Sequence, residues 1–263
     1  MGLIELISSR IPRIYRTMFG TCLVKTVQLD DGSLARVMQL GGVYQSATYL
    51  DVRRFDPVFS YYYSFDQAFD CGLEPHRILM VGGGGYSWPK HVAFRHHGAV
   101  SLDVVEIDPA ITLVARKHFY LDECMGRFPG CINLIAGDGR RYLSVCDDSK
   151  YDCIVLDAFS GFEPVISLAT AECSLEVRRV LTNDGVLLAN VVSGNGGLDL
   201  TFLRRVVGSY RQAFEHVYVA PCDEDPFAVE DNYLLFATNG PWKPSGYLPY
   251  DETFPLEPLY DEN

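Results

Sequence analysis

The chain has 263 residues, of which 48% are hydrophobic, so one large domain, or a domain with a small appendage, can bury a substantial core. Acidic residues number 34 and basic residues 22, which gives a formal net charge of −12. Because binding to phosphates depends on clustered Lys and Arg, this charge argues against nucleic acid as a partner and favours neutral or cationic ligands.

The first 20 residues mix apolar side chains with Arg10, Arg13 and Arg16. They lack the continuous apolar core of a signal peptide. The pattern predicts an amphipathic helix on the surface or at a dimer contact, with a role at a membrane surface as the alternative.

Residues 21–50 have the pattern of short antiparallel strands. Apolar runs at 23–29 and 34–40 flank an Asp-Asp-Gly turn at 30–32, which is a strong hairpin signal. Gly41 and Gly42 turn the chain again before a third run at 43–50. An aromatic-rich helix is predicted over 56–72. We therefore assign residues 1–72 to an N-terminal helix and β-hairpin unit.

From residue 77 onward, apolar strands alternate with helices. Strands are predicted at 77–81, 101–108, 131–135, 151–156, 185–192, 217–220 and 232–238, and helices from Ser87 and at 109–119, 140–145, 170–181 and 200–214. This alternation predicts a doubly wound α/β domain over residues 73–240, with a mostly parallel sheet covered on both faces. Residues 241–263, rich in Pro, Tyr and acids, are predicted to form an extended arm or a partly disordered tail.

Glycines and an acid follow the first two strands of this domain. In an open α/β sheet, ligands bind beyond the carboxyl ends of the strands. Glycines at 82–85 let a ligand approach the backbone and the N–H groups of the next helix, although a tight structural turn is the alternative. Glu106, about 20 residues further on, is placed to accept hydrogen bonds from ribose hydroxyls. The alternative for Glu106 is a helix-capping cluster with Asp108.

Two further acids follow later strands. Asp138, in a Gly-Asp-Gly motif, is placed to accept a hydrogen bond from an exocyclic amine such as that of adenine, or to cap the helix at Arg140. Asp157 directly follows the buried strand at 151–156 and faces the predicted cleft. Partial burial would raise its pKa towards that of a working base, whereas capping of the next loop is the structural alternative.

In this order and spacing, the four motifs resemble the spermidine synthase family of aminopropyltransferases. Gly-Val-Tyr-Gln at 42–45 and Phe-Ser-Tyr at 59–61 resemble N-terminal positions of the same family. The likeness covers roughly residues 20–240. It implies a Rossmann-like, methyltransferase-type sheet with a small N-terminal antiparallel β unit, and each motif alone also fits class I methyltransferases.

The resemblance implies a co-substrate, an acceptor and a set of site residues. The co-substrate is decarboxylated S-adenosylmethionine or S-adenosylmethionine, with no metal, and the acceptor is a small amine. Asp157 would deprotonate the amine, which then displaces the thioether sulfur in line. The resemblance also implies a cytoplasmic homodimer. The implied co-substrate contacts are Gln45, Gly82, Gly83, Gly84, Glu106, Ile107, Asp138 and Gly139, and the acceptor contacts are Tyr61, Tyr62, Phe159 and Ser160.

Three positions depart from the family pattern. Gly85 and Ser160 stand where the family has aspartates that hold cationic groups, and Tyr62 stands where it has His or Gln. Because charge-assisted hydrogen bonds are roughly twice as strong as neutral ones, losing two of them favours a ligand that retains a carboxylate. Three functions therefore stay open: aminopropyl transfer, methyl or carboxyaminopropyl transfer from intact S-adenosylmethionine, and nucleoside binding without catalysis.

Cysteine and histidine usage bears on metals and redox state. The eight cysteines form no C-x-x-C pair and the histidines are scattered, which predicts no structural zinc. Several cysteines lie within apolar runs, which is typical of buried free thiols in a reducing cytosol. No run approaches 18 consecutive apolar residues, so the sequence predicts no membrane-spanning segment.

Overall fold

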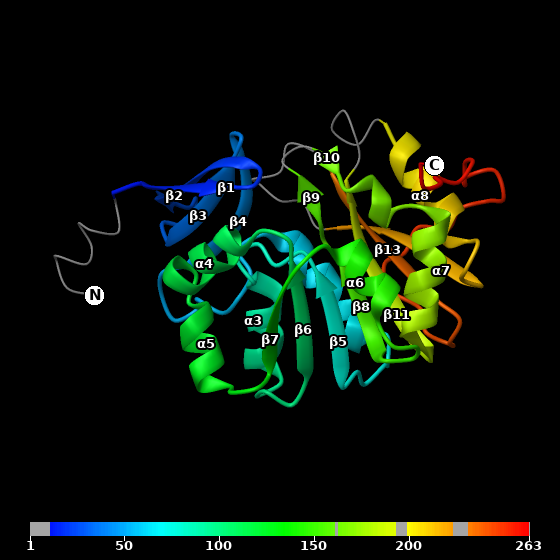
Figure 1. Cartoon of the computed structure of the whole chain (residues 1–263), viewed down its shortest axis with the longest axis horizontal. Helices are drawn as coiled ribbons and strands as arrows, with labels where there is room; N and C mark the ends of the chain where they lie inside the picture. The colour runs from blue at the N-terminus through cyan, green and yellow to red at the C-terminus, as the bar shows by residue number, and fades with distance from the viewer. Residues whose placement is uncertain (1–10, 161–162, 193–198, 223–230, 263) are drawn as a thin grey trace.

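Two β-sheets of different size organise the chain. The computed structural model describes residues 11–160, 163–192, 199–222 and 231–262, without the side chains of residues 159, 160, 163 and 164. A four-stranded antiparallel sheet lies beyond one end of a seven-stranded mixed sheet that carries helices on both faces (Figure 1). The predicted α/β class and the small N-terminal β unit are confirmed.

The small sheet contains its strands in chain order. These strands are β1 (Arg13–Thr17), β2 (Gly20–Gln28), β3 (Leu34–Leu40) and β4 (Val43–Tyr49). Both predicted hairpins are present, with Leu34 paired to Gln28 and Leu40 paired to Val43. The turns use glycines with positive φ, such as Gly32 at +81°, a conformation that side chains disfavour.

The predicted N-terminal helix is wrong for residues 13–17, which form strand β1, and residues 1–10 lie outside the described part. Arg13 pairs with Val24 and Thr17 with Gly20, so Met18 and Phe19 form a two-residue turn. Arg10, Arg13 and Arg16 recur at every third residue, a spacing that favours a helix, although five residues are too few for the pattern to exclude a strand. The free edge of β2 decides between them, because pairing satisfies the backbone groups of β1.

The large sheet has the strand order β12-β13-β11-β8-β5-β6-β7. Strands β7, β6, β5, β8 and β11 are parallel, while β13 runs antiparallel to both β11 and β12. This is the mostly parallel sheet that the sequence predicts. Its strands are β5 (Arg77–Val81), β6 (Ser101–Glu106), β7 (Ile132–Ala136), β8 (Tyr151–Leu156), β11 (Leu181–Val192), β12 (His216–Pro221) and β13 (Asn232–Thr238).

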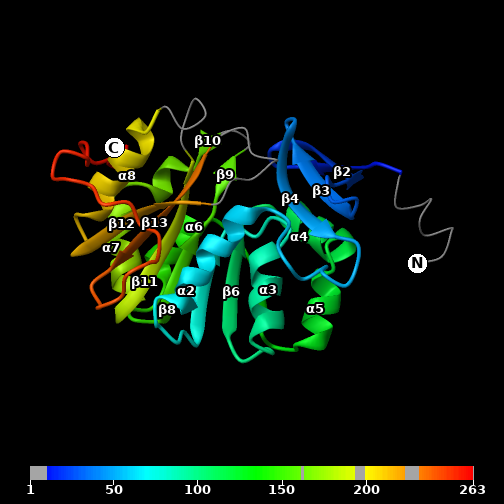
Figure 2. The ribbon, with the colours of Figure 1, turned by 180° about the vertical axis from the view of Figure 1, so that it is seen from behind.

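Helices cover both faces of this sheet. Helices α6 and α7 lie on the face seen in Figure 1, and α2 and α3 lie on the opposite face in Figure 2. Each face has its own buried cluster; Ile78 and Met80 of β5 belong to one and Leu79 and Val81 to the other. The helices are η1 (Ser60–Asp66), α2 (Gln67–Asp70), α3 (Ser87–Arg95), α4 (Pro109–His118), α5 (Leu121–Arg127), α6 (Gly139–Val145), η2 (Ile166–Leu168), α7 (Ala171–Val180) and α8 (Thr201–Tyr210).

Three details differ from the expected elements. The aromatic segment forms a 3-10 helix followed by a single α-helical turn, with Tyr62 and Phe65 buried. Helix α5 was not predicted; it begins after Tyr120, which adopts a left-handed conformation, and it buries Leu121 and Cys124. A short hairpin of β9 (Phe159–Ser160) and β10 (Glu163–Pro164) follows β8.

The C-terminal segment packs against the large domain. The Leu248 N–H donates to the Val219 carbonyl, and the Leu256 N–H donates to the Arg204 carbonyl. The Ala171 N–H at the start of α7 donates to the carbonyl of buried Leu259. Residues 248–259 therefore lie along β12, α8 and α7. The division of the chain at residues 72 and 240 stays a prediction.

The cysteines are free and mostly buried, as the sequence predicts. All eight cysteines are free, and six of them are buried. Within the described ranges, no helix is long and apolar enough to cross a bilayer. The same ranges contain no group of three His, Cys, Asp or Glu side chains arranged to hold a metal ion.

Packing of the C-terminal segment on α8 makes a testable prediction. A Cβ atom on Gly208 would lie 2.1 Å from the Leu256 carbonyl oxygen, so Gly208→Ala should displace the segment. We expect the free energy of unfolding to fall by about 1–3 kcal/mol in urea titrations. The matched control is Gly126→Ala in α5, where no atom lies within 4 Å of the new methyl group. That variant should be neutral or gain up to about 1 kcal/mol. Equal effects at the two glycines would contradict the packing.

Candidate active site

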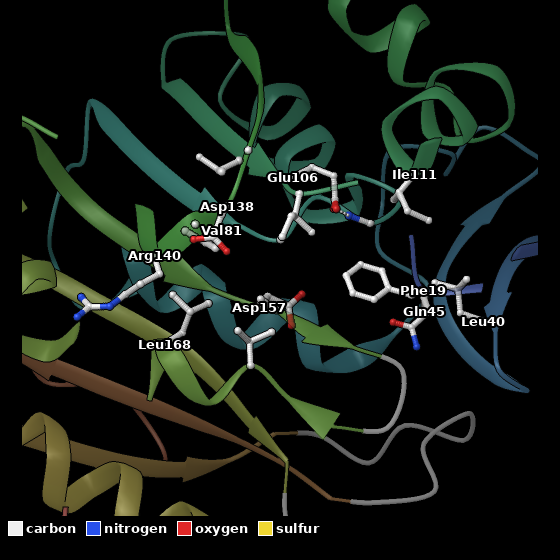
Figure 3. Close-up of a pocket in the computed structure, with 18 of the residues that line it drawn as sticks. Phe19, Leu40, Gln45, Val81, Glu106, Ile111, Asp138, Arg140, Asp157 and Leu168 are labelled. Atoms are coloured by element: carbon white, nitrogen blue, oxygen red, sulfur yellow. Dashed lines mark hydrogen bonds between the residues drawn. The ribbon is translucent and has the colours of Figure 1, made fainter. Parts of the chain in front are cut away.

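A cavity of about 440 Å³ lies at the carboxyl ends of the parallel strands, beside the small sheet. The main sheet, the small sheet and the aromatic segment all contribute to its wall. Figure 3 labels lining residues of both sheets, such as Val81 and Leu40. The predicted site residues that line it are Gln45, Tyr61, Tyr62, Gly82, Gly84, Glu106, Ile107, Asp138, Gly139 and Asp157. Gly83 does not line the cavity, but its N–H group donates to Glu106, which does. The side chains of Phe159 and Ser160 lie outside the described part.

The glycine turn after β5 depends on the absence of side chains. Gly82 has a φ of +98°, and a Cβ atom there would lie 2.0 Å from the Asp157 carbonyl oxygen. Gly139 is equally constrained, because its Cβ atom would lie 2.2 Å from Val81. These close approaches bring the ends of β5, β7 and β8 together, which places the three acids around one space.

Glu106 is buried and organises the backbone around it. Its Oε2 accepts the N–H groups of Gly83 at 2.9 Å and Gly84 at 3.1 Å, and its Oε1 accepts that of Asp108 at 2.9 Å. Burial raises the pKa of Glu106, and the three backbone hydrogen bonds oppose that rise. Because a carboxylate offers about four acceptor positions, these bonds leave room for a donor from the cavity.

Capping at the neighbouring helix is performed by Asp108, not by Glu106. Asp108 Oδ1 accepts the Ala110 N–H at 2.8 Å, at the start of α4. The capping alternative considered for the pair therefore applies to Asp108 alone. Glu106 keeps its carboxylate at the cavity wall.

Asp138 caps a helix and also lines the cavity. It caps α6 by accepting the Arg141 N–H at 2.8 Å, and its exposed side chain lines the cavity. Arg140 lines the same end of the cavity (Figure 3). The guanidinium of Arg140 is engaged elsewhere, 3.1 Å from Glu176 and 2.8 Å from Asp261. The cap and the ion pairs together fix this end of the cavity.

Asp157 lies at the opposite side of the cavity from Glu106 in Figure 3. Burial raises the pKa of Asp157 to about 6, against the lowering effect of hydrogen bonds from Asn190 and Tyr61. The Tyr61 hydroxyl donates to Oδ2 at 3.2 Å. Burial and the nearby Asp157 charge hold the Tyr61 pKa well above its ordinary value, so its hydroxyl stays a donor. A carboxyl group with this pKa is a suitable base near neutral pH.

Asn190 is a site residue that the sequence reasoning missed. Its Nδ2 donates to Asp157 Oδ1 at 3.1 Å, while its own Oδ1 is buried and has no hydrogen-bond partner among the described groups. β11 pairs with β8 in parallel, Ala189 beside Leu156, so Asn190 follows at the level of Asp157. The available signal was a lone amide within the apolar run at 185–192.

Part of the wall next to the small sheet was also missed. Phe19, Met38, Leu40 and Ile111 line the cavity there. Phe19 was not predicted as a cavity residue because the first 20 residues were expected to form a helix. The apolar Met38 and Leu40 belong to β3, and their pattern carries no signal that separates a cavity wall from a core.

Gly85, where the family has an acid, faces packed side chains and does not line the cavity. It is buried, and a Cβ atom there would lie 2.3 Å from Ser46 Oγ and 3.0 Å from a ring carbon of Phe119. Ser46 is itself fully buried, with its hydroxyl 3.1 Å from that of Ser87. Packing therefore excludes any side chain at position 85 unless Ser46 moves.

The raised pKa of Asp157 makes a prediction about stability. The folded chain binds a proton at Asp157 more tightly than the unfolded chain does, so this group lowers stability as pH rises from about 4 to about 6. We expect the free energy of unfolding to lose about 1–3 kcal/mol more over this range in the wild type than in Asp157→Asn. Denaturant titrations at pH 4 and pH 7 measure the difference. Identical pH dependence in the two proteins would rule out the shift.

Crowding at Gly85 makes a second prediction. Gly85→Asp should lose about 1–3 kcal/mol of stability through overpacking. In the background of Ser46→Gly, which removes the nearest atoms, the same substitution should cost less than half as much. A double-mutant cycle measures this coupling, and purely additive effects would show that Ser46 is not the obstacle.

The family described as "Spermine/spermidine synthase domain" matches residues 68–222, which is more than half of the chain. The polyamine aminopropyltransferase of Vibrio vulnificus (strain CMCP6) is 33% identical over 147 residues, covering 55% of this chain and 46% of that protein. This chain spans about half the length of curated relatives such as this one.

Solved structures agree on the fold. A probable spermidine synthase from Corynebacterium glutamicum ATCC 13032 superposes with a TM-score of 0.71 at 19% identity, covering 87% of this chain and 80% of that one. A spermidine synthase in complex with the transition state analogue AdoDATO gives a TM-score of 0.67 at 18% identity, covering 91% and 78%. With the profile match over 68–222 and the cavity described above, the chain belongs to the spermine/spermidine synthase family.

Proposed function

We propose that this protein transfers an aminopropyl group from decarboxylated S-adenosylmethionine to a small amine. The observation that carries the proposal is that Glu106, Asp138 and Asp157 line a single cavity. Membership of the family and the names of the relatives support the same chemistry. No metal enters this reaction.

The nucleoside would occupy the side of the cavity formed by Glu106 and Asp138. Glu106 retains an acceptor position for a ribose hydroxyl, and its buried charge is held by three backbone N–H groups. Asp138 would accept a hydrogen bond from the adenine amine while it caps α6. Apolar Ile107 and Leu168, from the other lining segments, would contact the base.

The acceptor amine would lie between Asp157 and the tyrosine pair. Tyr61 and Tyr62 stack with ring centroids 4.2 Å apart, and both line the cavity with Gln45. Asn190, which does not line the cavity, would act indirectly by holding Asp157 through its Nδ2 hydrogen bond. Phe159 and Ser160 complete the acceptor contacts that we propose.

The reaction would be a direct displacement. The amine nitrogen attacks the carbon attached to the sulfonium; the N–C bond forms, the C–S bond breaks, and its electron pair stays on sulfur as methylthioadenosine. Asp157, whose pKa is about 6, is ionised at neutral pH and takes the proton released from nitrogen. Holding both reactants in one cavity supplies much of the acceleration, because it removes the entropic cost of their encounter.

A second candidate is transfer of a methyl or carboxyaminopropyl group from intact S-adenosylmethionine. It is favoured by the absence of an acid at position 85, since the resemblance places there the aspartate that would hold the aminopropyl ammonium. Nucleoside binding without turnover is the remaining alternative. We also propose a cytoplasmic homodimer, as in the family resemblance, which light scattering and cell fractionation can examine.

The role of Asp157 can be tested directly. Asp157→Asn should lower kcat/KM for methylthioadenosine formation by about 10²–10⁴-fold, because the base is lost, while methylthioadenosine still binds within about threefold of wild type. The control is Glu252→Gln, a change in a side chain 91% exposed and remote from the cavity, which should leave kcat/KM unaltered. Undiminished turnover in Asp157→Asn would refute the assignment.

The choice of co-substrate has its own experiment. Each form of S-adenosylmethionine is incubated with a panel of mono-, di- and polyamines, and the products are identified by mass spectrometry. The main proposal expects methylthioadenosine from the decarboxylated form only. S-adenosylhomocysteine, or methylthioadenosine made from the intact form, would replace it with the second candidate. Binding with no product in any combination would leave only the non-enzymatic alternative.

A further inference from the structure

An aromatic side chain at the tip of the β1–β2 turn reaches into the cavity. Phe19 is 42% exposed, a large open area for an apolar ring, yet it lines the cavity wall. Figure 3 shows its ring in the middle of the view, with Glu106 and Ile111 on one side and Asp157 on the other. A ring in this place is open to contact by whatever the cavity binds.

Hydrogen bonds tie the tip to the acids of the nucleoside side. The Met18 N–H donates to Asp108 Oδ2 at 2.6 Å, and the Asp108 N–H donates to Glu106 Oε1 at 2.9 Å. Within the turn, Thr17 Oγ1 accepts the Phe19 N–H at 3.2 Å and donates to the Gly20 carbonyl at 2.8 Å. The position of the Phe19 backbone is therefore coupled to that of the Glu106 carboxylate.

The rest of the hairpin is fixed on α4. The Tyr15 hydroxyl hydrogen-bonds the His118 ring at 2.6 Å, and Arg36 donates to the His118 carbonyl at 3.0 Å. Burial, the first of several causes, lowers the pKa of His118 to about 4, so this contact keeps one protonation state near neutral pH. The hairpin thus holds Phe19 against the cavity from two anchored points.

The location of the ring specifies what it would contact. If Glu106 holds the ribose and Asp157 receives the amine proton, the reacting sulfur lies between these two carboxylates. Figure 3 shows the Phe19 ring beside this space, on the side of Gln45 and Leu40, and all three residues line the cavity. A sulfonium carries a positive charge, and the face of an aromatic ring attracts a cation. The thioether product is neutral and gains only dispersion contact.

We propose that Phe19 is a substrate-contacting specificity residue that binds the sulfonium centre through its ring face and so favours the charged co-substrate over its thioether product. This inference rests on the proposed function and deepens it. It predicts an effect on binding more than on the chemical step, because the positive charge passes to the nearby acceptor nitrogen during transfer. It holds whether an aminopropyl or another group is transferred.

The experiment compares charged and neutral ligands of matched shape. Calorimetry measures Kd for S-adenosylmethionine against S-adenosylhomocysteine, and for the decarboxylated sulfonium against the thioether that lacks only its S-methyl group. In Phe19→Leu we expect sulfonium affinity to fall about 3- to 30-fold and thioether affinity to fall at least threefold less. Phe19→Tyr, which keeps the ring, should remain within about threefold of wild type for both. The control is Ile14→Leu in β1, a side chain that is 72% exposed and not part of the cavity lining.

A second measurement avoids any doubt about folding. Fluorinated phenylalanine at position 19 weakens the negative ring face while nearly preserving its shape, so sulfonium affinity should fall stepwise with fluorine number and thioether affinity should stay level. Equal losses for the two ligand types in the Leu variant, or indifference to fluorination, would overturn the inference and leave the proposed function standing. If the wild-type protein binds none of the adenosyl ligands, the proposed function fails and the inference fails with it.

Discussion

The buried carboxylate of Glu106 is the interaction on which the rest of the site depends. Its two oxygens hold the N–H groups of Gly83, Gly84 and Asp108, so a single side chain joins the glycine turn to the start of α4. A buried charge is costly unless hydrogen bonds satisfy it, and here backbone groups do so. Asp108 then reaches Met18. Glu106 and Asp108 thus link the glycine turn of the large sheet to the β1–β2 turn of the small sheet through hydrogen bonds.

The opposite side of the cavity is built on the parallel pairing of β8 and β11. Register places Asn190 at the level of Asp157, and the amide orients the carboxylate by donating to it. The aromatic segment completes the arrangement, because Tyr61 donates to the other oxygen of Asp157. Both partners lower the pKa of Asp157 while burial raises it, and burial prevails. The carboxyl group of Asp157 is held by two neutral donors, so in the proposed reaction no cation of its described surroundings would compete with the amine.

Most of the fold and half of the site were predictable from the sequence. Strands β5 to β8 are apolar runs that end at a glycine or an acid. These end residues are what made Gly82, Glu106, Asp138 and Asp157 recognisable in the sequence. What could not be predicted depends on tertiary contacts. β1 became a strand because β2 offered an edge, and this made Phe19 a cavity residue. Asn190 acquired its meaning only from the register between two strands.

The packing of Ser46 beside Gly85 restricts which substitutions position 85 can accept. Once a hydroxymethyl group fills the space beside position 85, a single codon change back to aspartate meets Ser46 Oγ and the ring of Phe119. Two changes are then needed in a particular order, first at residue 46 and then at residue 85. A chain with serine at 46 therefore gains an acid at 85 without overpacking only if residue 46 changes as well. The sizes of residues 46 and 85 should therefore be inversely related among chains with this backbone. A chain with aspartate at 85 should have a smaller residue at 46 than a chain with glycine at 85.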